Sequence, residues 1–543
     1  MKRLKLGIGA AVGILLTAPQ IALMFLADQW IDLPFLPFDL FDWLTRVLPG
    51  PVITFGIDLM IDGMLALGVD VADNAKTAEQ IASILLYLGG GVLAGVIFSG
   101  YLSARKIKPD TITGLVMGAL YGLPMISIHL AIGDSSLSSG LRILWLSALF
   151  LVWGIVAARA HLRLASAEAP PDVAGEPVGA ERISRRQFLI TLGGASAVIT
   201  VVGSGVGALL AGSKRRKLEQ VLADSLVHQT ETDAGVPFPN LNDPVMPAPG
   251  TRPEYTPIKD HYKVFIRTQP STVDGSTWVL PITGLVDNPL MPDLETLKSQ
   301  FQRRDQYVTL TCISGRVGTG LIGTTMWSCV SLKEVLAACA VRPEARYLNI
   351  TSADGFHESV DLDLIAGDER IMLCYAWDGH DLPFDHGFPL RIWIPDLYGM
   401  KQPKWITAIE VTDVYKEGYW VSRNWDEIAR VNTTSVIDTV ALQALADDSD
   451  RKLVPVGGIA YAGARGISGV EVKVDDGPWQ PAHLRAPLSE TTWVIWRFDW
   501  PFEAGDHTLA VRCNEAVGTP QIEADQSPRP SGSTGIHTFD VDG

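Results

Sequence analysis

The chain has 543 residues, of which 47% are hydrophobic and 19% are charged, and its Gly and Pro residues follow no fixed period. This length gives room for two to four domains, and the composition excludes collagen-like and low-complexity classes. Residues 1–160 carry 10 Lys or Arg and 11 Asp or Glu, whereas residues 161–543 carry 34 and 49. The second part is therefore acidic, which argues against nucleic acid as a partner.

Apolar stretches indicate a membrane part at the N-terminal side. Four stretches before residue 165 approach or exceed the ~20 residues that cross a bilayer as a helix. They are Leu6–Ala27, Ile81–Tyr101, Ile112–Ile132 and Leu141–Ala160. A weaker stretch, Val52–Val69, contains two aspartates, which are costly at the bilayer centre. With the preceding Ile31–Trp43 we expect it to be interfacial or re-entrant.

Loop charges orient this four-span module, residues 1–165. Lys2, Arg3 and Lys5 place the N-terminus in the cytoplasm, and the basic residues near 105 and 160 then also face inward. Residues 182–212 contain Ser184-Arg185-Arg186-Gln187-Phe188-Leu189, which resembles a twin-arginine export signal, followed by the apolar segment Phe188–Ala211. The alternative is an ordinary span with a basic flank. Because no clean cleavage site follows, we expect a retained anchor helix and an extracytoplasmic position for residues 213–543.

The remaining chain is predicted to form a linker and two soluble domains. Residues 213–254 form the linker, and residues 255–450 mix strands with short helices at Asp293–Phe301 and Leu332–Ala340. The strands predicted in this domain are Tyr262–Ile266, Thr277–Thr283, Tyr307–Thr311, Tyr347–Thr351, Ile371–Tyr375, Leu390–Ile394 and Trp405–Val411. Residues 451–543 show strands alone, at Leu453–Ile459, Val470–Val474, Trp493–Phe498 and His507–Cys513. The expected fold is a multi-pass helical region followed by an α+β domain and a C-terminal β-sandwich.

Cysteine usage is sparse. The five cysteines, at positions 312, 329, 339, 374 and 513, form no CxxC pair, which excludes a zinc ribbon, a c-type haem site and a disulfide-dense scaffold. We expect the four after Cys312 to pack in the core.

Cys312 stands at the start of a glycine-rich loop, within TLTCISGRVGTGLIGTTMW. Glycines at this density let a backbone approach a bulky ligand, and a single thiolate suits a soft metal that takes its other ligands elsewhere. A buried hydrophobe or a nucleophile is an alternative for Cys312.

A second cluster lies at Leu373–Trp405. His386, Arg391, Lys401 and Lys404 are donor or cationic groups of the kind that bind a phosphate and a polar heterocycle. A core histidine with surface bases is the alternative.

Together the two clusters resemble the molybdopterin-binding domain of the sulfite oxidase family. The segments DGHDLPFDHGFPLR and YGMKQPKW are the most specific, and the resemblance covers about Tyr255 to Gln521. It is strongest to bacterial membrane-bound members with multi-pass N-termini. GGIAYAGARGISGVEVKVDDGPWQPAHL resembles the family's immunoglobulin-like, dimerisation-type C-terminal domain. A dimer is compatible with this resemblance, but the sequence shows no self-complementary surface.

The resemblance implies a molybdenum cofactor and names the residues around it. Cys312 would ligate molybdenum. The residues that would hold the pterin and its phosphate, or line them, are Thr324, His386, Arg391, Gly399, Lys401 and Lys404. Those that would act on substrate are Cys312, Arg316, Arg465, Trp425 and Lys263.

Three of these positions depart from the family pattern. Lys263 or Arg267 would have to replace a substrate-binding arginine, Val317 follows Arg316 where a second arginine is usual, and Trp425 takes the place of a tyrosine. An indole donates one hydrogen bond but cannot exchange protons as a phenol does. Because fewer cations bind a sulfite dianion less well, a neutral or larger substrate such as a sulfoxide fits no worse.

The sequence thus predicts a membrane-anchored, extracytoplasmic molybdenum oxidoreductase that transfers an oxygen atom. It would exchange electrons with a separate cytochrome or quinone-linked partner and act on a small oxyanion or sulfoxide-type substrate. A sulfoxide or oxide reductase fed by membrane electrons, and a binding protein with a degenerate cofactor site, are the alternatives.

Overall fold

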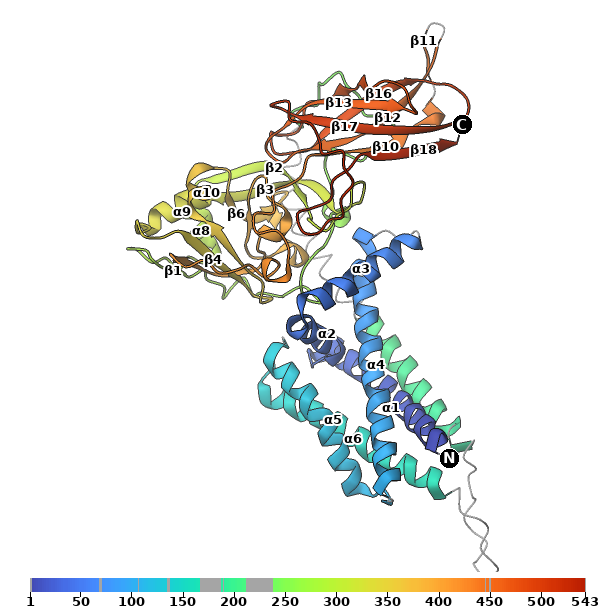
Figure 1. The fold of residues 1–543 in the computed structure, drawn as a ribbon. Coiled ribbons are helices and arrows are strands. Elements are labelled where there is room, and N and C mark those ends of the chain that lie inside the picture. Colours follow the sequence, from blue (N-terminus) through green and yellow to red (C-terminus); the bar gives the residue numbers. More distant parts are fainter. Residues whose placement is uncertain are drawn as a thin grey trace, which may run out of the picture. The chain divides into compact units, whose positions relative to one another are not determined.

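The computed structural model describes residues 2–67, 71–105, 107–133, 137–166, 187–188, 190–210, 238–444, 446–448 and 451–542. Contacts divide it into two compact units (Figure 1). One comprises Met1–Leu48 and Lys76–Asp224, and the other Pro49–Ala75 and Ser225–Gly543. Of the twin-arginine-like motif only Gln187 and Phe188 are among the described residues.

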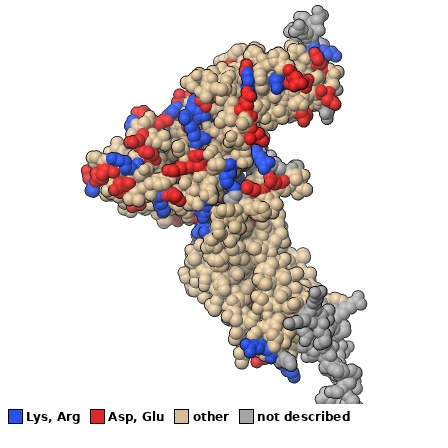
Figure 2. Space-filling view, in the orientation of Figure 1, with Lys and Arg blue, Asp and Glu red and all other residues tan. Residues whose placement is uncertain are grey.

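The first unit is built from long helices. They are α1 (Lys2–Ile31), α2 (Leu36–Val47), α4 (Val71–Arg105), α5 (Thr111–Ile132), α6 (Ser139–Ser166) and a further helix over Ile190–Leu210. Five of them, all except α2, are long and apolar enough to cross a membrane, in agreement with the five predicted stretches. The surface of this part is almost free of charge over the helices in Figure 2, while Lys, Arg, Asp and Glu cover the second unit.

Small residues bring α5 and α6 together. A Cβ atom at Gly114 would lie 2.7 Å from the carbonyl oxygen of Gly154, and one at Gly118 would collide with the backbone of Phe150. Glycine here permits the close backbone contact by which helices associate in lipid. Asp110 caps α5 by accepting a hydrogen bond from the amide of Thr113, 2.7 Å away.

A buried ion-pairing contact joins α2 to α5. Asp39 Oδ2 lies 2.8 Å from His129 Nδ1, and only 8% and 1% of the two residues is exposed. Such a polar pair in an apolar bundle is stable only while both members are present.

Replacing Asp39 alone by Leu should therefore destabilise the bundle by about 3–5 kcal/mol, because His129 is left buried without its partner. The double variant Asp39→Leu/His129→Leu should regain most of this loss. Unfolding titrations of the detergent-solubilised protein measure both. A single variant as stable as the double variant would contradict the prediction.

Two sheets form the core of the α+β domain. One has the order β2-β3-β6-β7, with β8 also paired to β6, and the other has the order β1-β9-β4-β5. The strands are β1 (Ile282–Gly284), β2 (Arg303–Thr311), β3 (Ile322–Ser331), β4 (Tyr347–Ser352), β5 (His357–Asp361), β6 (Met372–Trp377), β7 (His380–Asp381), β8 (Arg391–Trp393) and β9 (Ile406–Thr412). The helices are α8 (Leu294–Gln300), α9 (Leu332–Cys339) and α10 (Leu362–Gly367), with 3-10 turns η1 (Ile258–Asp260), η2 (Phe384–His386), η3 (Gly399–Lys401) and η4 (Val421–Arg423). Residues from both sheets and from α8 and α9 share one hydrophobic core.

Most predicted strands and both predicted helices occur here, although Thr277–Thr283 is a strand only from Ile282 onward and β3, β5, β7 and α10 were not predicted. Two further differences concern the packing. Tyr262–Ile266 is not a strand, because His261 and Tyr262 turn inward and are buried instead of pairing with a neighbour. The second difference is a disulfide between Cys329 and Cys374, which face each other across β3 and β6. Cys339 and Cys513 are buried and unpaired by disulfides, as expected.

The C-terminal part has two antiparallel sheets around one core. Their orders are β10-β12-β16-β15, with β11 paired to β12, and β14-β13-β17-β18. The strands are β10 (Thr434–Val440), β11 (Ala446–Asp448), β12 (Arg451–Tyr461), β13 (Ile467–Val474), β14 (Gln480–Pro481), β15 (His483–Leu484), β16 (Val494–Pro501), β17 (Asp506–Glu515) and β18 (His537–Asp542), with a 3-10 turn η5 (Leu442–Ala444). All four strands expected after residue 451 are present, and β10 joins this sheet from before that position.

Residues 49–75 also belong to the second unit. They include α3 (Gly50–Ala66), which at 17 residues is not among the helices long enough to cross a membrane.

Candidate active site

Cys312 lies where β2 ends. The antiparallel pairing of β2 and β3 closes at Thr311 and Ile322, and the intervening loop carries the thiol. Cys312 is only partly buried, and its Sγ atom lies 3.1 Å from Ser314 Oγ. Burial raises the pKa of the thiol, while the Ser314 hydrogen bonds and the charge of Lys404 oppose the rise.

His386 of η2 and Arg391 of β8 contact Trp377 and Trp327, two rings of the hydrophobic cluster against which Cys312 packs. His386 and Arg391 are each 3% exposed, and Arg391 Nη1 donates to the His386 carbonyl oxygen at 3.0 Å. The guanidinium stacks over the Trp327 ring at 4.4 Å. Burial lowers the pKa of Arg391 to about 10, and burial together with His261 and Lys404 holds that of His386 well below its usual range.

His261 and Tyr262 complete the buried group and were not predicted as site residues. The two rings stack at 4.9 Å, and the His261 ring lies 5.4 Å from that of His386. Burial lowers the pKa of His261 to about 3. A side chain at position 323 would meet the His261 ring at 2.6 Å, so glycine is needed there. Both residues lie in a segment whose apolar pattern suggested a strand, so no local signal marked them.

Several polar atoms of this buried group lack a hydrogen-bond partner among the described residues. They include His386 Nε2, Arg391 Nε and the indole nitrogen of Trp377, whose ring lies 4.5 Å from the His386 ring. Leaving such groups buried and unsatisfied costs about 1–3 kcal/mol each. A bound heterocycle with an anionic phosphate would satisfy them, so the residues present fit a pterin cofactor.

The other predicted cofactor residues have varied surroundings. Lys404 Nζ donates to the carbonyl oxygens of Val264 and Asp385 at 3.0 and 2.9 Å and lies over the Trp405 ring. Position 399 lies beside the Tyr262 hydroxyl, since a Cβ atom there would be 3.5 Å from it.

Two predicted residues point into the protein framework. Lys401 Nζ forms a buried ion pair with Glu358 Oε1 at 2.6 Å. Thr324 is fully buried, and its hydroxyl contacts that of Thr309 across the strand pair.

Each predicted substrate-binding cation has a carboxylate partner. Lys263 Nζ lies 2.6 Å from Asp385 Oδ2, and Arg316 Nη2 lies 2.6 Å from Asp62 Oδ1. Arg465 is held by Glu515 at 2.9 Å and by Asp396 at 3.1 Å. Their positive charges are therefore largely neutralised within the protein.

Trp425 follows η4 and is partly buried. Its ring lies 4.7 Å from the guanidinium of Arg529, a cation–π contact with the C-terminal segment. No sequence motif marks Arg529, because it stands far from every motif along the chain.

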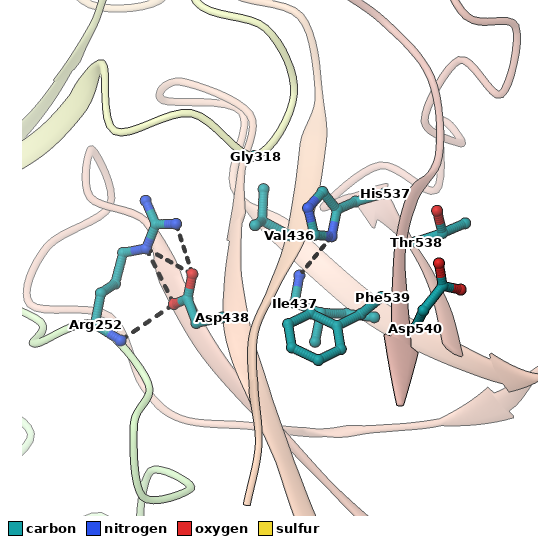
Figure 3. Close-up of a pocket in the computed structure, with 9 residues that line it drawn as sticks. All are labelled: Arg252, Gly318, Val436, Ile437, Asp438, His537, Thr538, Phe539 and Asp540. Atoms are coloured by element: carbon teal, nitrogen blue, oxygen red, sulfur yellow. Dashed lines mark hydrogen bonds and ion pairs between the residues drawn. The ribbon is translucent and has the colours of Figure 1, made fainter. Parts of the chain in front are cut away.

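The C-terminal sheets also hold the glycine-rich loop. Ser533 Oγ donates to the Gly315 carbonyl oxygen at 2.7 Å, and Gly318, at φ +89°, packs against the His537 ring. Figure 3 shows this contact at the edge of a surface pocket of about 410 Å³, where Arg252 is bonded to Asp438. None of the predicted site residues lines that pocket.

Comparisons with known proteins agree with this geometry. The protein-family model described as oxidoreductase molybdopterin binding domain matches residues 267–420 of this chain. The mitochondrial sulfite oxidase of Macaca fascicularis is 25% identical over 47% of this chain and 52% of its own length. The uncharacterized oxidoreductase YuiH of Bacillus subtilis is 31% identical over 27% of this chain and 71% of its own length. The putative protein-methionine-sulfoxide reductase subunit YedZ1 of Azospira oryzae is 30% identical over 28% of this chain and 56% of its own length.

The matched domain and the relatives show that the chain contains a molybdopterin-binding oxidoreductase domain. The chain belongs to the sulfite oxidase family, and the molybdenum cofactor is the family's prosthetic group. It spans about half the length of the sulfite oxidase that it matches.

The low pKa of His261 has a consequence for stability. An unfolded histidine titrates near 6.5, so the unfolded state binds this proton more tightly, and stability falls by up to about 1.4 kcal/mol per pH unit as pH drops from 6.5 towards 3. His261→Phe should remove this contribution, which melting temperatures between pH 7.5 and 5 measure.

His507 is the matched control, because the hydrogen bond that its ring donates to Asp475 raises its pKa in the folded state. Its contribution is present at low pH and disappears as pH rises through the raised pKa, so His507→Phe should change the slope in the opposite sense. If the melting temperatures of the wild type and of His261→Phe changed equally with pH, the account would be contradicted.

Proposed function

We propose that this chain is a membrane-anchored oxidoreductase that transfers an oxygen atom at a molybdenum centre held by Cys312 and exchanges electrons with a separate redox partner. The observation that carries this proposal is a group of buried, unsatisfied polar atoms around the hydrophobic cluster against which Cys312 packs. His386 Nε2 and Arg391 Nε have no partner among the described residues, yet both lie in the interior. Such an arrangement is costly unless a ligand completes it.

The bound cofactor would supply two-electron oxygen-atom exchange, and the chain would supply its placement. Cys312 would provide the protein's thiolate ligand. Arg391 would orient polar atoms of the pterin through its planar guanidinium, and His386 and Lys404 would add hydrogen bonds and positive charge. The neutral state of His386, favoured by its low pKa, allows its ring to accept or donate one hydrogen bond according to tautomer.

An extracytoplasmic position of the catalytic domain is part of the proposal. Span parity and loop charge support it, as does the twin-arginine-like motif at residues 184–189. The disulfide between Cys329 and Cys374 adds independent support, because such bonds persist mainly in oxidising compartments. The C-terminal sheets would form the family's immunoglobulin-like, dimerisation-type domain.

A sulfoxide-type substrate is favoured over sulfite. Lys263, Arg316 and Arg465 are the cations that a dianion would need, and each is paired with a carboxylate. A neutral sulfoxide requires no free cation, and one relative is named as a putative methionine sulfoxide reductase subunit. In that direction two electrons and two protons convert a sulfoxide to a sulfide and water, the electrons coming from a cytochrome or quinone-linked partner.

Replacing Cys312 by Ser should leave the pterin bound and abolish activity, because the hydroxyl is a poor ligand for molybdenum. Pterin fluorescence after denaturation measures the first effect. Assays with methionine sulfoxide and reduced viologen, and with sulfite and a dye acceptor, measure the second. The control is Cys339→Ala, in the buried α9 helix, which should keep activity. Full activity of Cys312→Ser would exclude the proposed ligand.

Arg391→Lys should lower cofactor content about 10-fold or more, because an ammonium cannot reproduce the planar fork of the guanidinium. Molybdenum and pterin per chain are the measured quantities. Arg370→Lys is the control, since Arg370 pairs with Asp368 and Glu490 away from the site. Normal cofactor content in Arg391→Lys would show that this arginine does not hold the pterin.

A further inference from the structure

Two aspartates of α3 contact arginines of the catalytic part. Asp62 Oδ1 lies 2.6 Å from Arg316 Nη2, and Asp58 Oδ2 lies 3.3 Å from Arg529 Nη1. The aspartates are four residues apart and so lie on one face of the helix. Residues 49–75 belong to the same compact unit as the catalytic part, so these contacts are internal to that unit.

Arg316 belongs to the loop that carries Cys312, and Arg529 contacts Trp425. Arg316 lines a small cavity of about 50 Å³ together with Gly315, Tyr398 and Ser533. Arg529 stacks on Trp425.

The start of α3 reaches the same region. A Cβ atom at Gly50 would lie 3.4 Å from the Cα atom of Arg423, in the turn before Trp425. The helix therefore contacts the loop itself and two further segments, those of Arg423 and Arg529.

Because Asp58 and Asp62 are one helical turn apart, their ion pairs hold the guanidinium groups of Arg316 and Arg529 on one face of α3, and paired guanidinium groups are typical of tetrahedral oxyanion recognition. Here the two carboxylates of α3 take the place of that anion. The Arg316 and Asp62 side chains are 53% and 59% exposed, and exposed ion pairs contribute only about 0–1 kcal/mol each. The aspartates of α3 can thus compete with a dilute oxyanion for the arginines, and their ion pairs are weak enough to break.

We propose that Asp58 and Asp62 are specificity determinants of this site: as built-in anions they occupy Arg316 and Arg529 and thereby weaken the binding of small oxyanions relative to neutral substrates. This inference rests on the proposed function in one respect only: the neighbouring centre is taken to be the molybdenum site at Cys312. The anion site itself consists of side chains of this chain.

Sulfate is the probe, since it is a tetrahedral dianion that does not react. Sulfate binding to the full-length protein in detergent is measured by isothermal titration calorimetry. In Asp58→Asn/Asp62→Asn the affinity should rise at least tenfold over the wild type, because both arginines lose their carboxylate partners. Adding Arg316→Gln should cancel that gain. Asp287→Asn, which breaks the exposed pair with Arg342, is the matched control and should leave sulfate affinity unchanged.

A measurement on the wild-type protein covers the case in which the double variant does not fold. Saturating sulfate should speed hydrogen exchange of the α3 amides, Gly50–Ala66, because the anion displaces the aspartates. An unchanged sulfate affinity in the folded double variant, or unchanged α3 exchange in the wild type at saturation, would overturn the inference. Both readouts are independent of molybdenum, whose content is determined separately and tests the proposed function alone.

Discussion

The burial of hydrogen-bond donors next to an accessible thiol is the constraint on which the rest of this structure depends. Arg391 and His386 are almost wholly removed from water, and their pKa values are lowered by that burial. A protein interior tolerates such groups only when a partner satisfies them. The η2 turn and strand β8 place these groups against Trp377 and Trp327, in the cluster against which Cys312 packs, and the family to which the chain belongs supplies a reason for the arrangement, a pterin cofactor with an anionic phosphate.

Local patterns predicted much of the fold. Five apolar stretches became long helices, and strands such as β9 and β12 appear where alternation and turns indicated them. Tyr262–Ile266 was wrong as a strand, because inward packing of His261 and Tyr262 produces the same apolar signal as a sheet. The cross-strand Cys329–Cys374 bond depends on the register of β3 and β6, which no local motif encodes. The immunoglobulin-like assignment of the C-terminal sheets and the residue roles at the site stay predictions.

Charge explains why sequence motifs alone gave an incomplete picture of the substrate site. The motifs identify Arg316, Arg465 and Lys263 as cations, but they do not identify the carboxylates that neutralise them. Asp62, Glu515 and Asp385 come from separate parts of the chain. Under the proposed function these pairs favour neutral substrates. The Asp62–Arg316 pair also connects the Cys312 loop to α3, a helix in a segment that sequence analysis expected to be interfacial or re-entrant.

X-ray absorption at the molybdenum edge of the purified full-length protein tests the central claim most directly, because it counts the sulfur atoms bound to the metal. The account predicts one sulfur ligand fewer in Cys312→Ser than in the wild type, with the pterin sulfurs retained in both. An identical sulfur count in the two proteins would show that Cys312 is not a ligand and would contradict the account.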